Sequence, residues 1–288
     1  MRPQNLKRQR RNARQEPPPS RINKQSQRKN MRDEPYRWIE AIQDRRDYIE
    51  DQLRLGSPVV GLGYNEGMVL LTVGRGQRKI FEVHDRIALS AIGHPADIER
   101  LRMLVTDTAS VQGFQNATED VNLHRLTNFV LAHTFKQAFE SIVGEAFIIK
   151  MLLAELGNAP EQNRWTLINY DGNVRTDTVA SVIGGTEVIE ERMQNYLANA
   201  PAQTALDLNA ALQFGLETWA VGRELSLRDS EEPEEEFDID ATQLRAIVDD
   251  ALEDGAIEAG VLETTQRGPS KFRLLSPEEI EAALAAWN

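Results

Sequence analysis

The chain has 288 residues, of which 41% are hydrophobic and 27% are charged, and its formal net charge is −12. The sequence contains neither an apolar run long enough to cross a membrane nor an apolar signal core near its start, which argues against a membrane partner. Cysteine is absent, which excludes disulfides and thiolate chemistry. We therefore expect a cytoplasmic globular protein with a core in one large domain or two small ones.

The first part of the chain is strongly basic. Residues 1–32 hold eleven Lys or Arg and a single acid, Glu16. This segment buries too little surface to offset its ordering entropy, so we expect residues 1–35 to be a disordered basic tail. A basic arm is also typical of nucleic-acid binding. Residues 1–32 contain no aromatic side chains to stack on bases, so the sequence favours a flexible tail and no nucleic-acid partner.

A helix and a group of strands follow. The stretch YRWIEAIQDRRDYIEDQLRLG predicts a helix, because Trp38, Ile39, Ile42, Ile49 and Leu53 recur near helical spacing and Gly56 ends it. The next segments are short and rich in Val, Ile and Leu, with the turn signals YNEG and GRGQ between them: SPVVGLGY, EGMVLLTV, RKIFEVHD and RIALSAIG. They predict a meander of strands with hairpins.

Two helices and a second set of strands come next. The first helix is expected over residues 96–113, with Ile98, Leu101 and Val105 on one face. The second is expected over residues 122–141, with these residues on one face: Leu126, Phe129, Val130 and His133. Strands return in EAFIIKMLLAEL, RWTLINYD and TVASVIGG, and helices in TEVIEERMQNYLANA and QTALDLNAALQFGLETWAV.

The last part of the chain is separated by an acidic stretch. Residues 229–240 contain eight acids and predict a solvated loop between residues 36–228 and 241–288. Beyond it, the sequence predicts a helix over TQLRAIVDDALED and a strand pair in AIEAGVLE and KFRLL. The terminal helix has Ser276 as its cap, Pro277 at its first position and Glu279 three residues after the cap. Residues 241–288 are therefore expected to complete the domain of residues 36–228.

The order of these elements predicts the fold class. Helices enter in pairs between sets of strands, which favours an α+β fold of two stacked sheets with helices on both outer faces. Strict alternation of strand and helix would favour a parallel sheet instead.

Several motifs suggest chemistry. GLGYNEG and GRGQRK resemble phosphate-binding loops, but a strand rather than a helix follows each, so no nucleotide cofactor is expected. The histidines lack a metal-ligand spacing, so no metal site is expected: His84, His94, His124 and His133. Gly56-Ser57 fits either a self-cleaving hydrolase that exposes an N-terminal nucleophile or an ordinary joint between helix and strand. Lys79 fits either a solvated lysine at a strand end or a cation that binds a carboxylate or activates a nucleophile.

The run from Gly56 to Leu101 resembles proteasome core-particle subunits. That family has a Gly-hydroxyl joint, a strand that opens with Lys, an Asp-containing turn, a small-residue strand that ends in Gly, and an Asp-bearing helix. These features match Gly56-Ser57, Lys79-Ile80, Asp85, Ala91–Gly93 and Asp97. The resemblance extends over residues 36–288, and AIEAGVLETTQRGPSKFRLLSPEEI is similar to the terminal strands of actinobacterial α subunits.

The resemblance implies a four-layer αββα sandwich of the N-terminal nucleophile hydrolase type. In this family β subunits cleave off a propeptide and use the new N-terminal Thr, whereas α subunits keep a preceding helix and have no active site. Ser57 falls at the nucleophile position, and Val73 falls where a supporting Asp is expected. Pro58 restricts the conformation of Ser57. The sequence therefore favours a non-catalytic α-type subunit, with a self-processing serine hydrolase and a stand-alone ring as alternatives.

The α-type resemblance also implies partners. It implies a heptameric ring of identical subunits, stacked on catalytic β subunits and contacted by a ring-shaped AAA+ ATPase activator. The carboxylate at the end of an activator tail would pair with Lys79, beside a pocket glycine at Gly93. Asp51 corresponds to an acid on the helix before the first strand. Residues 1–32 would form the gate of the ring, and no cofactor is implied.

Overall fold

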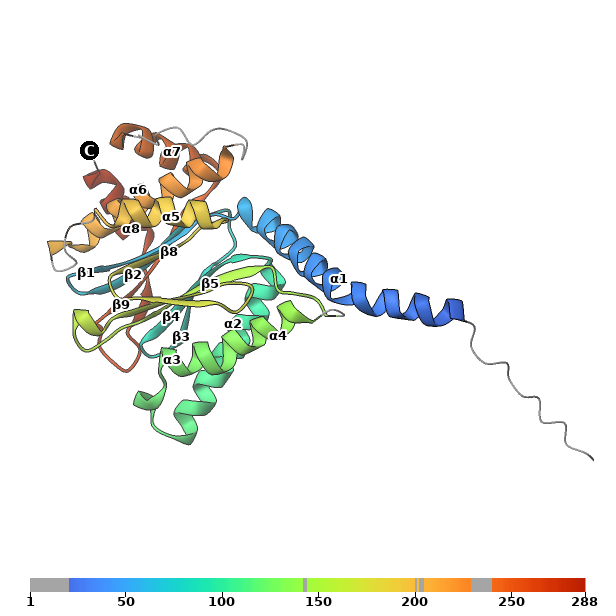
Figure 1. Ribbon diagram of the computed structural model, residues 1–288. Helices are drawn as coiled ribbons and strands as arrows, with labels where there is room; N and C mark the ends of the chain where they lie inside the picture. The colour runs from blue at the N-terminus through green and yellow to red at the C-terminus, as the bar shows by residue number, and fades with distance from the viewer. Residues whose placement is uncertain (1–20, 142–143, 200, 202–204, 229–239, 288) are drawn as a thin grey trace, which may run out of the picture. The chain divides into compact units, whose positions relative to one another are not determined.

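The computed structural model describes residues 21–141, 144–199, 201, 205–228 and 240–287 (Figure 1). The chain divides into two compact units, Met1–Asp44 and Arg45–Asn288. No helix in these described ranges is long and apolar enough to cross a membrane.

The first helix, α1, runs from Arg21 to Arg54 and therefore begins in the first unit. The prediction of a disordered tail over residues 1–35 is wrong from Arg21 onward, and residues 1–20 lie outside the described part of the chain. Arg, Lys, Gln and Met are good helix formers, and a helix that already exists is extended without a new nucleation cost. Pro35 lies inside α1, where its missing N–H removes one backbone hydrogen bond.

The second unit contains two sheets of five strands each. The first has the order β10-β9-β2-β1-β8, and the second has the order β3-β4-β5-β6-β7. All paired strands are antiparallel. The strands are β1 (Val59–Tyr64), β2 (Gly67–Gly74), β3 (Ile80–His84), β4 (Ile87–Gly93), β5 (Ile149–Glu155), β6 (Arg164–Ile168), β7 (Val174–Asp177), β8 (Ala180–Ile183), β9 (Ala256–Glu263) and β10 (Phe272–Leu274).

Helices cover the outer faces of both sheets (Figure 1). Those over the first sheet are α5 (Glu187–Leu197), α6 (Leu208–Leu227), α7 (Ala241–Asp254) and α8 (Pro277–Ala286). Those over the second are α2 (Pro95–Gln115), α3 (Leu123–Arg125), η2 (Leu126–Leu131) and α4 (Ala132–Glu140). The short helices η1 (Thr118–Asp120) and η3 (Pro160–Gln162) lie in connections. The predicted α+β sandwich of two sheets between helical layers is confirmed.

Three packed zones hold these layers together. One apolar cluster joins the first sheet to α5, α6, α7 and α8, and another joins the second sheet to α2 and α4. Between the sheets, the Trp165 side chain is fully buried. It packs so close to Gly61 that a Cβ there would lie 2.4 Å from the indole ring. The absence of a side chain at Gly61 therefore lets β1 approach Trp165 on β6.

The helical region after α2 differs from the prediction in its buried face. Phe129 is 73% exposed and His133 is also exposed. The prediction that these two residues lie on the buried apolar face is therefore wrong. The segment η2 is a π-helix, which has a wider turn than an α-helix and rotates the residues after it. Leu131 and Phe135 are consequently the buried residues there.

The end of α1 is fixed to the second sheet and its helices. The Arg45 guanidinium donates hydrogen bonds of 2.7 Å to the backbone carbonyls of Phe139 and Ser141, at the end of α4. Ile49 and Leu53 are buried on the same side of α1. These contacts set where α1 ends and where β1 begins.

The C-terminal segment completes the first sheet. β9 pairs with β2 over the whole length of β2, from Gly67 opposite Glu263 to Gly74 opposite Ala256. The predicted cap of α8 is present, since the Ser276 hydroxyl accepts a hydrogen bond from the backbone of residue 279. The acidic loop predicted at 229–240 lies, apart from Asp240, outside the described residues and stays a prediction.

Candidate functional site

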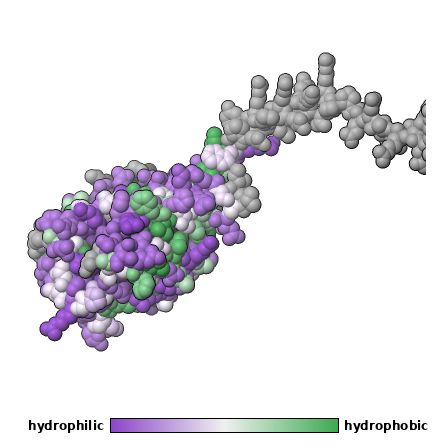
Figure 2. Space-filling view, turned by 90° about the horizontal axis from the view of Figure 1, so that it is seen from below, coloured by the Kyte–Doolittle hydropathy of each residue, from purple (hydrophilic) through white to green (hydrophobic). Residues whose placement is uncertain are grey.

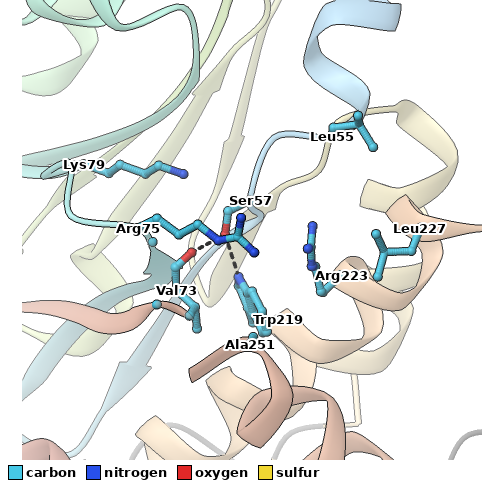
Figure 3. Close-up of a pocket in the computed structure, with 11 residues that line it drawn as sticks. Leu55, Ser57, Val73, Arg75, Lys79, Trp219, Arg223, Leu227 and Ala251 are labelled. Carbon is cyan, nitrogen blue, oxygen red and sulfur yellow. Dashed lines mark hydrogen bonds between the residues drawn. The ribbon is translucent and has the colours of Figure 1, made fainter. Parts of the chain in front are cut away.

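A cavity of about 420 Å³ opens where α1 leads into β1 (Figure 3). One part of its wall is formed by the α1–β1 joint, the end of β2 and the connection from β2 to β3. The other part is formed by α6, the end of α7 and Gly255. The lining residues are Leu55, Ser57, Val73, Gly74, Arg75, Lys79, Trp219, Arg223, Leu227, Ala251 and Gly255. All of them lie in the second unit.

The Ser57 hydroxyl makes two hydrogen bonds with the surrounding elements. It donates to the backbone carbonyl of Val73 and accepts from the Trp219 indole N–H at 3.1 Å. The Thr72 hydroxyl lies 3.3 Å away and itself donates to the carbonyl of Pro58. None of these partners is a base that could take the serine proton at neutral pH. The arrangement therefore fixes the Ser57 side chain in place.

Val73 presents its backbone, not its side chain, to Ser57. Its side chain is 5% exposed and belongs to the apolar cluster beneath α6 and α7. A carboxylate at this position would lose its hydration inside that cluster without a charged partner of its own. The position expected to hold the supporting Asp is thus part of the core.

Lys79 immediately precedes β3, and its backbone is tied to the other sheet. The backbone N–H groups of Lys79 and Ile80 each donate a hydrogen bond of 2.8 Å to the carboxylate of Glu258 on β9. Burial lowers the pKa of the Lys79 ammonium below its usual value, and the charge of Glu258 opposes that shift. The lysine side chain points toward the region of Ser57 (Figure 3).

Two further cations face the same space, and the sequence reasoning missed both. Arg75 follows β2, and Arg223 lies on α6 one turn after Trp219. The Arg75 side chain points toward Ser57, and the Arg223 side chain extends into the space between Ser57 and Leu227 (Figure 3). Arg75 lies in GRGQRK, a stretch whose sequence suggests only a phosphate loop. The spacing of Arg223 from Trp219 would have placed it on the same helix face, but the sequence does not say which face of α6 meets the joint.

The other two predicted site residues do not line this pocket. Gly93 ends β4 with a φ of +132°, and a Cβ there would lie 2.0 Å from the carbonyl oxygen of Ile148. Only glycine tolerates that conformation and contact. Asp51 is exposed on α1. The structure thus brings together Ser57, Val73 and Lys79 and leaves Gly93 and Asp51 outside the pocket.

The histidines do not form a metal site with other ligands in the described ranges, where no group of three or more His, Cys, Asp or Glu side chains converges. One of them has a structural role, because His94 caps α2 by accepting a hydrogen bond from the backbone of Ala96 at 3.3 Å.

Comparison with known proteins gives a consistent set of relatives. No family model matches the chain. A proteasome subunit alpha of Streptomyces scabiei is 26% identical over 249 residues, which cover 86% of this chain and 90% of that protein. One from a Nocardioides species is 26% identical over 247 residues, which cover 85% and 86%. One from Actinosynnema mirum is 30% identical over 148 residues, and there the match spans only 51% of this chain and 56% of the relative.

The stacked antiparallel sheets with helices on both outer faces define an αββα sandwich of the N-terminal nucleophile hydrolase type. Within that class, the chain is similar to the proteasome α subunits of actinobacteria.

Proposed function

We propose that this chain is a non-catalytic α subunit of a bacterial proteasome core particle. In this role it forms a heptameric ring with copies of itself, stacks on catalytic β subunits, controls substrate access and binds an AAA+ ATPase activator. The assembly degrades proteins in the cytoplasm, and its catalytic β subunits hydrolyse the peptide bonds.

The state of Ser57 is the observation that carries this proposal. The residue at the nucleophile position has its hydroxyl bonded to Val73 and Trp219, and it follows a helix whose end is buried and hydrogen-bonded. Cleavage before Ser57 would detach α1, together with the buried Ile49 and Leu53. Both features support a strand that stays attached to the preceding chain.

Lys79 supports the docking role. Its ammonium lines an open pocket, and only its backbone N–H donates a hydrogen bond to the Glu258 carboxylate. An ammonium facing a carboxylate in a partly desolvated site forms a charge-assisted hydrogen bond worth about 1.5–3 kcal/mol. We propose Lys79 as the residue that pairs with an activator's terminal carboxylate, with Gly93 and Asp51 contributing near the boundary with a neighbouring subunit.

The experiment that tests this function uses the chain assembled with an actinobacterial β subunit and its ATPase. Lys79→Met should reduce ATPase-stimulated degradation of a folded substrate at least tenfold, while sizing shows that the particle remains assembled. Lys136→Met, which removes an exposed lysine on α4, is the matched control and should leave stimulation intact. Unchanged stimulation in the Lys79 variant would remove the docking assignment.

The basic N-terminal segment is proposed as the gate. Deleting residues 1–20 leaves α1 whole and should raise basal peptide turnover by the assembled particle. Equal turnover before and after the deletion would remove the gating role.

A further inference from the structure

Three cations share one pocket and have little opposite charge of their own. Arg75 and Lys79 line the cavity from the connection between β2 and β3, Arg223 lines it from α6, and the three side chains enter the space beside Ser57 (Figure 3). A single bound carboxylate neutralises only one of them. The pocket therefore has more positive charge than the docking of a terminal carboxylate requires.

The acids near these cations neutralise them only in part. Both carboxylate oxygens of Glu258 accept hydrogen bonds from backbone N–H groups. Its negative charge still stabilises the Lys79 ammonium. Asp254 lies 3.6 Å from Arg75, but both side chains are about three-quarters exposed, so this pair is weak. Arg223 is half-buried on α6, and no ion pair or hydrogen bond of its side chain occurs with the described residues.

The rim of the pocket is apolar. Leu55 and Leu227 both line it and are 62% and 59% exposed. They lie beside Arg223, whereas Lys79 lies on the other side of Ser57 (Figure 3). The site thus offers two cationic regions and an apolar surface within a cavity large enough for the last residues of a peptide.

We propose that this pocket selects peptide C-termini that carry an acidic residue next to the terminal residue. Lys79 binds the terminal carboxylate, Arg75 and Arg223 bind the acidic side chain, and Leu55 and Leu227 contact an apolar terminal side chain. The Lys79 part rests on the proposed function, whereas the second anion subsite rests on the two arginines. The ligand chemistry is therefore an acidic, apolar C-terminal tail.

The test uses the full-length chain and four synthetic probes. Each probe is a fluorescein-labelled Gly-Ser peptide that ends in Glu-Leu or in Gln-Leu, prepared either with a free terminal carboxylate or with a terminal amide. Binding is followed by fluorescence anisotropy at low ionic strength and again at high salt. The free acid ending in Glu-Leu should bind about fivefold more tightly than that ending in Gln-Leu, or about 1 kcal/mol. High salt should reduce this ratio, because the contact is partly exposed.

Two variants separate the subsites. Arg223→Gln should bring the Glu-to-Gln ratio close to one and keep the preference for a free acid over an amide. Lys79→Met should remove the preference for a free acid and keep the Glu-to-Gln ratio. A wild-type chain that prefers free acids but binds Glu-Leu and Gln-Leu equally would overturn the second subsite. A chain that prefers Glu-Leu but does not distinguish acid from amide would retain that subsite and contradict the proposed docking role of Lys79.

A charge reversal guards against variants that lose binding through misfolding. Arg223→Glu should bind a probe that ends in Lys-Leu more tightly than one that ends in Glu-Leu, which is a gain that a misfolded chain cannot show. If Arg223→Glu still prefers Glu-Leu, Arg223 does not contact the acidic side chain and the proposal fails.

Discussion

At the scale of single residues, the Ser57 side chain links three elements of the fold by hydrogen bonds. Its hydroxyl connects the α1–β1 joint to the end of β2 through Val73 and to α6 through Trp219. A hydroxyl that joins three elements is useful to the fold without being a nucleophile. Its loss would leave the buried Trp219 N–H without an acceptor, which is costly because the group has already given up its water.

Ser57→Ala should therefore affect stability and not catalysis. We expect the free energy of unfolding to fall by about 1–3 kcal/mol, measured by urea denaturation, while the particle assembled with β subunits keeps its peptide hydrolysis. Ser110→Ala removes an exposed hydroxyl on α2 and should change stability very little. Loss of hydrolysis with full stability in the Ser57 variant would reveal a nucleophile.

The lowered pKa of Lys79 predicts a pH dependence of docking. Burial lowers this pKa below its ordinary value of 10.5, and only the charged ammonium pairs with a carboxylate. Binding of a peptide with a free C-terminus should be complete at neutral pH and should weaken, as pH rises, before pH 10.5 is reached. Lys79→Arg keeps its charge in this range and should bind independently of pH. An identical alkaline loss in both proteins would assign the titration to another group.

At the scale of elements, a buried ion pair connects the two sheets. The Lys150 ammonium on β5 donates to the Glu190 carboxylate on α5 at 2.8 Å and to the carbonyl of Gly184, after β8, at 3.2 Å. Their side chains are only 4% and 8% exposed. The pair thus joins an inner strand of one sheet to the helix that covers the other.

Removing one partner of this pair should be much worse than removing both. Lys150→Met leaves a buried carboxylate unpaired and should cost about 3–5 kcal/mol of unfolding free energy. Adding Glu190→Leu should recover most of that loss, as seen by urea denaturation of both variants. Lys136→Met is a surface control and should cost little. If the double variant is as unstable as the single one, the ion pair does not stabilise the fold through charge compensation.

Most elements are predictable from the sequence because their local signals agree. Pro95 and Ser276 mark helix starts, and the turn NYDG between β6 and β7 contains Gly172 with a φ of +85°. The π-helical η2 has no such signal, since its wider turn depends on packing. α1 begins earlier than the sequence predicts, because composition alone does not separate a polar helix from a disordered tail.

Only the site residues that lie close together along the sequence could be predicted. Ser57, Val73 and Lys79 follow one another through the first strands, so the family pattern locates them. Arg223 reaches the same pocket from α6 through a long-range contact that depends on helix orientation. Local spacing contains no information on that orientation.

At the scale of the whole molecule, an exposed apolar surface is relevant to the proposed assembly. Figure 2 shows hydrophobic side chains grouped on the face that carries α2 and α4. The large apolar side chains exposed on the helices of this layer are Met103, Val111, Phe114 and Phe129. Phe114 is 92% exposed, and grouped apolar side chains of this kind are typical of interaction surfaces.

Phe114→Asp should therefore weaken assembly without unfolding the subunit. A fully exposed position tolerates the change with an effect on stability of about 0.5 kcal/mol or less. The elution profile of the chain co-expressed with β subunits should shift from the particle toward free subunits. Ser110→Asp introduces the same charge one turn earlier on α2 and is the matched control. A normal particle with Asp at position 114 would exclude this side chain from an interface.

The central proposal is that this chain is a non-catalytic subunit of an assembly whose partners hydrolyse the peptides. Native mass spectrometry of the chain co-expressed with an actinobacterial proteasome β subunit tests it most directly. The account predicts rings of seven full-length copies that retain every residue before Ser57, bound to processed β subunits. A shortened chain that begins at Ser57 and hydrolyses peptides without a partner would contradict it.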